Sequence, residues 1–122
     1  MELSTVLLAV SLIAADSPFA CDRSALSPTE RKRHFEEVTP ALLNSVKGVT
    51  ELPDGYVLEL PADAGAIQLA AEWVSRERLC CPFLDITLKL EREKGKFTLQ
   101  LTGRQGTKEF LRADFEKWFA GR

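Results

Sequence analysis

The sequence predicts an α+β domain: a four-stranded antiparallel sheet made of two β-hairpins, with helices on one face and an N-terminal helical arm. The prediction rests on two hairpin patterns and on a helical pattern after each of them. The chain has 122 residues, of which 45% are hydrophobic and 28% charged, the composition of one ordinary globular domain. We therefore expect residues 21–122 to form a single domain, preceded by an apolar segment over residues 1–20.

The helical arm is expected to begin at Ser27. The run Ser27-Pro28-Thr29-Glu30 combines a capping serine, a proline at the first helical position and a glutamate at the third. Apolar residues then recur at helical spacing as far as Val46. Pro40 removes one backbone hydrogen bond, so the helix should kink or split near Thr39.

The first hairpin is predicted where Val49–Leu52 and Tyr56–Leu60 flank the turn Pro53-Asp54-Gly55. Asp63 can cap the helix that follows. The apolar stripe of this helix is predicted at Ile67, Ala70, Ala71 and Val74.

The second hairpin is predicted over Ile86–Leu90 and Phe97–Leu101, where apolar and polar residues alternate. The two hairpins align at an offset of about forty residues. Each is followed by a helical segment that carries a tryptophan, Trp73 and Trp118. A pseudo-twofold repeat of one hairpin-helix unit would account for this similarity.

The charge balance argues against nucleic acid as a partner. The formal net charge is -2, whereas phosphate binding needs a basic surplus. The basic run 31–34 lies between acidic residues, so we interpret it as a solvated helix face. The single histidine, His34, is accordingly expected at the surface.

The apolar run from Val6 to Ala15 has the length of a signal-peptide core and is too short to span a membrane. Glu2, without any Lys or Arg before the run, argues against export. We expect a cytoplasmic protein, with export as the alternative if residues 1–20 act as a signal peptide. An added strand, a packed arm and an over-long start are further readings of this segment.

Two of the three cysteines, Cys80 and Cys81, are adjacent at the predicted end of the second helix. Glu77 lies one helical turn earlier, on the side nearest both thiols. Neighbouring thiolates favour soft ions, here zinc, copper(I), mercury or arsenic(III). Cys21 could supply a third sulfur and His34 a nitrogen, although the sequence does not define their distance from the pair.

Three functions follow from these residues. The first is a small, non-enzymatic protein that binds a soft metal or metalloid ion. The second is a thiol redox protein in which Cys21 pairs with Cys80 or Cys81. The third is a protein-interaction module whose cysteines only pack, acting as a homodimer or with another protein.

Catalysis by these thiols is disfavoured without being excluded. A thiol at a helix C-terminus feels the negative end of the helix dipole, and Glu77 adds negative charge. A bridge between Cys80 and Cys81 would be strained, because adjacent Cα atoms lie only about 3.8 Å apart. The sequence therefore favours a protein that is not an enzyme.

Several motifs together carry a family resemblance: Phe19–Asp22, Ala25–Arg31, Glu51–Tyr56, Glu77–Phe83 and Leu101–Gly103. The chain resembles a family of small, largely uncharacterised bacterial proteins that share a Glu-Arg-x-Cys-Cys-Pro-Phe motif. Members also occur attached to MerR-type metal-responsive regulators. The resemblance implies that Cys21 belongs with Cys80 and Cys81, and that soft-metal or thiol chemistry takes place there. No DNA-binding helix pair precedes the domain, so transcriptional regulation is not implied.

Overall fold

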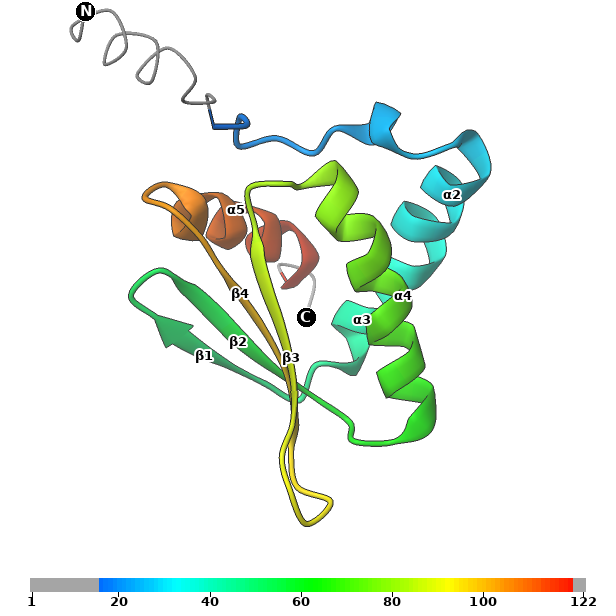
Figure 1. Cartoon of the computed structure of the whole chain (residues 1–122), viewed down its shortest axis with the longest axis vertical. Coiled ribbons are helices and arrows are strands. Elements are labelled where there is room, and N and C mark those ends of the chain that lie inside the picture. Colours follow the sequence, from blue (N-terminus) through cyan, green and yellow to red (C-terminus); the bar gives the residue numbers. More distant parts are fainter. Residues whose placement is uncertain (1–15, 120–122) are drawn as a thin grey trace, which may run out of the picture.

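The structure, a computed structural model, describes residues 16–119, except for the side chains of residues 118 and 119. Most of the apolar segment predicted over residues 1–20 lies outside the described residues. The elements are, in order, η1 (Arg23–Ala25), α2 (Pro28–Lys32), η2 (Arg33–Val38), α3 (Thr39–Ser45), β1 (Gly48–Leu52), β2 (Gly55–Leu60), α4 (Ala64–Cys80), β3 (Asp85–Leu90), β4 (Phe97–Thr102) and α5 (Thr107–Phe119) (Figure 1).

The predicted α+β fold is confirmed. The four strands form one antiparallel sheet in the order β1-β2-β4-β3. The second strand of each hairpin is central, and Leu58 of β2 pairs with Leu99 of β4. Each central strand leads into a helix, α4 or α5. This is the arrangement that a pseudo-twofold repeat requires.

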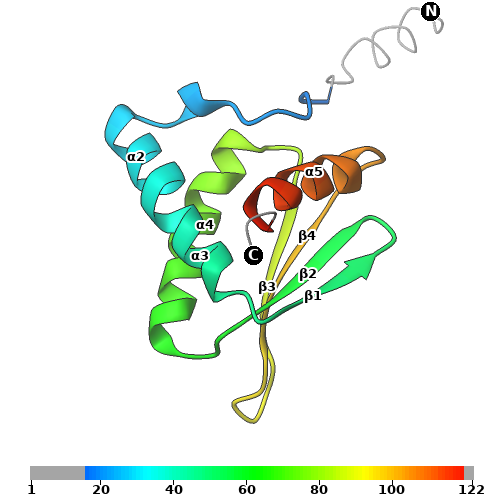
Figure 2. The same cartoon turned by 180° about the vertical axis from the view of Figure 1, so that it is seen from behind.

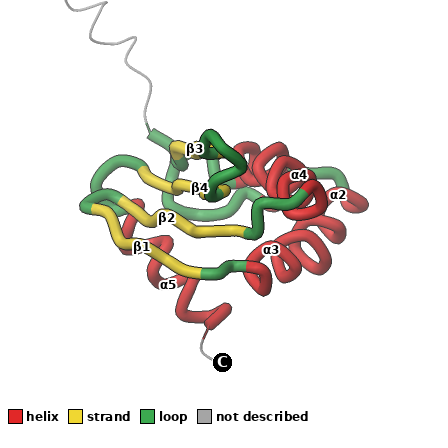
Figure 3. Tube along the Cα trace, turned by 90° about the horizontal axis from the view of Figure 1, so that it is seen from below, coloured by secondary structure: helices red, strands yellow, loops and turns green. Residues whose placement is uncertain are grey.

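The core lies between one face of the sheet and the helices. Leu58, Leu99 and Leu101 are no more than 1% exposed, because alternate residues of each strand point to the same face. They pack with apolar side chains of α3, α4 and α5. Figure 2 shows the sheet and these helices from behind, and Figure 3 shows α2, α3 and α4 grouped together, apart from α5.

The buried stripe of α4 differs from the prediction at one position and extends further along the helix. Ala71 is exposed, whereas Ala70, Trp73, Glu77 and Cys80 are buried. Their spacing of three, four and three residues keeps them on one face of the helix. A carboxylate and a thiol thus end the face that packs against the rest of the molecule.

The helical arm widens, rather than breaks, before Pro40. Residues Arg33–Val38 form a π-helical turn, in which the N–H of Thr39 donates to the carbonyl of His34, five residues earlier. Pro40 follows at the second position of α3 and has no N–H to donate to the helical ladder. The predicted disruption near Thr39 therefore takes the form of a π turn, which brings His34 into the protein.

The expected capping residues are both confirmed. Ser27 and Glu30 form a capping box at the start of α2. The side chain of Asp63 accepts a hydrogen bond from the N–H of Ala66 at the start of α4. Over residues 16–119, no helix is both long and apolar enough to cross a membrane.

Candidate metal centre

One of the three cysteines reaches the site on an extended strap, residues 16–22, which runs across the end of the molecule near the start of β3 (Figure 1). Phe19 anchors the strap. Its ring meets Phe83 edge-on at 5.3 Å between centroids, and the guanidinium of Arg104 lies 4.1 Å from its centroid. A Cβ at Gly106 would lie 2.5 Å from the Phe19 ring, so the position of this ring requires glycine at residue 106.

A backbone hydrogen bond ties the strap to the end of α4. The N–H of Asp22 donates to the carbonyl of Cys80 at 2.7 Å. This carbonyl lies in the last turn of the helix, where carbonyl groups accept no hydrogen bond from within the helix. The bond sets Cys21 next to Cys81 and replaces water at a helix end.

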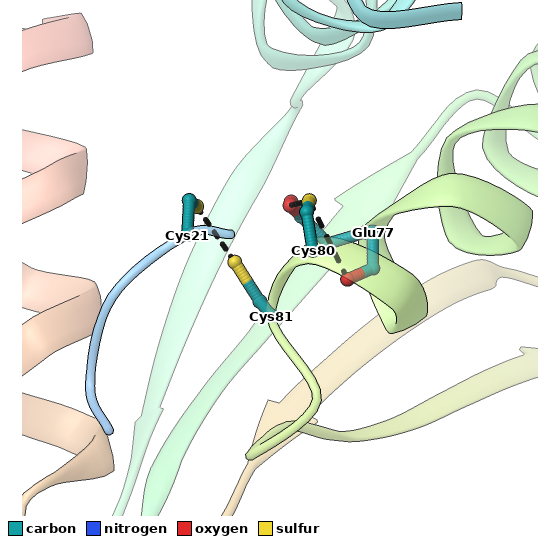
Figure 4. Close-up of side chains that lie close together, drawn as sticks. All are labelled: Cys21, Glu77, Cys80 and Cys81. Atoms are coloured by element: carbon teal, nitrogen blue, oxygen red, sulfur yellow. Dashed lines mark hydrogen bonds between the residues drawn. The ribbon is translucent and has the colours of Figure 1, made fainter. Parts of the chain in front are cut away.

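The end of α4 separates the two adjacent thiols. The N–H of Cys81 makes the last helical bond, to the carbonyl of Glu77 at 2.7 Å. Pro82 has no N–H to continue the ladder, and Cys81 leaves the helix with φ -122° and ψ 67°. Cys80 consequently stays on the helix face beside Glu77, whereas the thiol of Cys81 points toward Cys21 (Figure 4).

Four potential ligand atoms converge at this corner. The sulfurs of Cys21 and Cys81 share a hydrogen bond at 2.7 Å, and the thiol of Cys80 donates to Oε1 of Glu77 at 3.3 Å. One ligand atom from each of the four residues lies within 4.8 Å of all the others. All three cysteines are free thiols. Within residues 16–119, this group could therefore hold a metal ion.

His34 is fully buried, so the expectation of a surface position was wrong. Its ring stacks against Trp73 and meets Phe35 edge-on. Its Nε2 lies 3.5 Å from Oε1 of Glu77, but neither ring nitrogen makes a hydrogen bond to the described residues. His34 is a neighbour of the carboxylate and is not one of the four clustered ligand residues, so its role as a ligand stays a prediction.

The thiols differ in how readily they lose a proton. Hydrogen bonds from Cys80 and Cys81 hold the pKa of Cys21 well below its ordinary value. Hydrogen bonding to Cys21 raises the pKa of both partners, and burial and the negative charge of Glu77 raise it further. The first proton lost from the cluster therefore leaves Cys21, the most exposed of the three thiols.

The donor set suits soft ions. A zinc-thiolate bond is about 2.3 Å long, which separates tetrahedral ligand atoms by about 3.8 Å. Side-chain rotations within the cluster can reach that spacing, because its four atoms already lie within 4.8 Å of one another. Three sulfurs and one carboxylate favour zinc, copper(I), mercury or arsenic(III) over magnesium or calcium.

Three residues near the site were missed by the sequence interpretation. Phe19 and Arg104 hold the strap, and no local pattern connects them. Asp114 of α5 is half-buried near the cluster, and burial raises its pKa. His34 did carry a signal, because it precedes the buried residues Val38 and Leu42 by four and eight positions on one helix face.

Comparisons of the chain with protein-family models, with curated proteins and with solved structures found no match. The family suggested by the cysteine-pair motif therefore stays a prediction.

Proposed function

We propose that the protein is a non-enzymatic binder of a soft metal or metalloid ion, with Cys21, Cys80 and Cys81 as ligands and Glu77 as an auxiliary ligand. The observation that supports this most directly is the approach of Cys21 to the pair. Its sulfur lies 2.7 Å from that of Cys81, although 60 positions separate them in the sequence. Packing alone does not require three thiols to meet at one point.

Burial favours an occupant that carries positive charge. Cys80 and Cys81 are 0% and 2% exposed, and buried thiolates are costly unless a cation offsets their charge. Glu77 is only 8% exposed, and its partner at ion-pair distance is the histidine His34. A soft cation bound by the sulfurs would compensate the carboxylate as well.

The identity of the ion follows from titration of the reduced protein, prepared without a histidine tag. Zinc, copper(I), arsenite and mercury(II) are added separately, and native mass spectrometry counts the ions bound per chain. We expect one ion per chain for at least one of the four. The double variant Cys80→Ser, Cys81→Ser should lose this binding, and Cys21→Ser should weaken it by about tenfold or more.

A matched control is Thr50→Ser on β1, which is exposed and is not one of the four clustered residues. It should bind as the natural protein does, and circular dichroism should show every variant folded. Failure of all four ions to bind, or equal binding by the double variant, would contradict the proposal.

The proposed family membership agrees with this function, since the motif occurs in that family beside metal-responsive regulators. A cytoplasmic location also stays a proposal, as does a homodimer or another protein partner. A role in nucleic-acid binding is not proposed, because the net charge of -2 gives no basic surplus.

The contact between Cys21 and Cys81 also favours a second candidate, a thiol redox function. Glutathione disulfide would take two electrons from these thiols, forming one S–S bond and releasing two glutathione thiols. Counting free thiols by alkylation and mass spectrometry should show the loss of two. Cys80→Ser should still form the disulfide and Cys81→Ser should not. Three free thiols under oxidising conditions would argue against this function.

A further inference from the structure

A cavity of about 50 Å³ lies next to the thiol cluster, between α3, α4, α5 and the sheet. Cys81 and Glu77 form part of its wall. Its lining is mixed, with apolar side chains that include Leu43, Trp73 and Leu111 and with a second carboxylate, that of Asp114. Of the four clustered residues, Glu77 and Cys81 line the cavity, so the cavity is continuous with the site through these two side chains.

The volume corresponds to a small organic group. One water needs about 10 to 15 Å³ measured in this way, so about 50 Å³ accommodates a group of a few non-hydrogen atoms. The side chains of Leu111 and Trp73 are 4% and 5% exposed. The cavity is partly open to solvent, so an apolar group placed against Leu111 and Trp73 would be shielded from water on that side.

We propose that the site takes a trivalent metalloid carrying one small organic substituent, and that the substituent occupies this cavity. The inference rests on the proposed function and narrows its ligand to an organoarsenic(III)-type species. Cys81 joins the two parts of the site, because its sulfur contacts that of Cys21 and its side chain also lines the cavity. A metalloid on this sulfur therefore has the cavity beside it.

The binding reaction is an exchange of ligands without oxidation. A species R–As(OH)₂ reacts with the thiols of Cys21 and Cys81, forming two As–S bonds and breaking two As–O bonds. The two thiol protons leave with the two hydroxyl groups as two waters. Arsenic stays trivalent, and its three ligands are the sulfurs of Cys21 and Cys81 and the carbon substituent.

Leu111 offers the sharpest test, because it lines the cavity from α5, far in sequence from the ligands. The probes are arsenite, methylarsonous acid and phenylarsonous acid, each in competition with a small dithiol. The natural protein should prefer the methyl over the phenyl species. Leu111→Ala enlarges the cavity and should improve binding of the phenyl species by about tenfold. Leu111→Phe fills the cavity and should weaken binding of the methyl species by about tenfold. Arsenite binding should change in neither variant.

The matched control is Leu88→Phe, the same enlargement at a position of β3 that is 39% exposed and outside the cavity. It should leave all three affinities unchanged. Arsenite binding without any effect of Leu111 on the methyl and phenyl species would overturn this inference and leave the proposed function standing. Absence of binding by all three arsenic species would overturn the inference, and the titration with the other ions would still decide the proposed function.

A direct measurement does not depend on how well the variants fold. In the complex of the natural protein with methylarsonous acid, the methyl protons should show nuclear Overhauser contacts to Trp73 and Leu111. Contacts limited to residues of the strap would place the methyl group outside the cavity and overturn the proposal. If water alone fills the cavity, the methyl protons will show no contact to Trp73 or Leu111, and this result would also overturn the proposal.

Discussion

Glu77 is a buried carboxylate beside two thiols, and its charge opposes their ionisation. Hydrogen bonding to Cys21 raises the pKa of Cys80 and Cys81, and the charge of Glu77 raises both pKa values further. Glu77→Gln should lower both pKa values, so that more thiolate is present at any given pH. We expect faster alkylation of Cys80 and Cys81 by iodoacetamide between pH 7 and 9, measured by peptide mass spectrometry.

The matched control for this prediction is Glu109→Gln, an exposed glutamate of α5. It should leave the alkylation rates unchanged. Unchanged or slower rates in Glu77→Gln would show that the carboxylate does not act on the thiols through its charge.

Cys21 should be the most reactive thiol at mildly acidic pH. Hydrogen bonds from Cys80 and Cys81 stabilise its thiolate and lower its pKa. We expect alkylation of Cys21 near pH 6, ahead of the other two. Cys81→Ala removes one of these donors, so the rate profile of Cys21 should move to higher pH. Equal reactivity of all three thiols near pH 6 would contradict this order.

The position of the strap depends on the packing of Phe19 against Gly106. Gly106 has a φ of 104°, and its missing Cβ leaves room for the aromatic ring. Gly106→Ala should displace the strap and with it Cys21. We expect a fall of about tenfold in ion affinity, and slower formation of the bridge between Cys21 and Cys81 in glutathione buffers.

Gly48→Ala is the matched control, because a Cβ at Gly48 meets no atom within 4 Å and Gly48 has no positive φ. It should bind the ion as the natural protein does. If both alanine variants lose affinity equally, the effect is a general loss of stability and not a displacement of the strap.

An ion-pair group joins the helical arm to α4. Hydrogen bonds from Arg33 and Arg76 lower the pKa of Glu72 from 4.5 to about 2. A pKa that is lower in the folded state adds stability above the unfolded pKa, and this stability is lost as the pH falls from 4.5 toward 2. The contribution should be about 0.5 to 1 kcal/mol, because the carboxylate is partly exposed and screened by water.

Urea denaturation at several pH values tests this pair. Glu72→Gln should be less stable than the natural protein at pH 7, and the difference should shrink as the pH is lowered from 4.5 toward 2. A constant difference across this range would mean that the charge of Glu72 contributes nothing.

For the whole molecule, a bound ion should stabilise the fold, because its ligands come from segments that unfolding separates. A ligand present at a hundred times its dissociation constant adds about 2.7 kcal/mol to the free energy of unfolding. The natural protein should gain about this amount in urea denaturation with the ion. The variant Cys80→Ser, Cys81→Ser should gain nothing.

The fold was largely predictable from local patterns. The turn Pro53-Asp54-Gly55, the alternation in each hairpin, and the caps at Ser27 and Asp63 all act over a few residues, so the sequence displays them directly. The position of Pro40 indicated a disturbance of the helix. It did not indicate a π turn, because the residue spacing does not show that the N–H of Thr39 bonds to the carbonyl of His34, five residues earlier.

The site was predictable only in part. The pair Cys80 and Cys81 and the nearby Glu77 belong to one helix, so their proximity follows from helix geometry. The approach of Cys21 depends on the path of a strap held by Phe19, which contacts side chains far away in the sequence. Such long-range packing leaves no periodic signal, and the position of Cys21 was therefore only implied by the resemblance.

X-ray absorption spectroscopy at the arsenic edge, on reduced protein loaded with one equivalent of arsenite, counts the sulfur ligands directly. We expect three sulfur neighbours around arsenic in the natural protein and two in Cys21→Ser. Oxygen neighbours in place of the third sulfur, or the same sulfur number with and without Cys21, would contradict a site built from all three thiols.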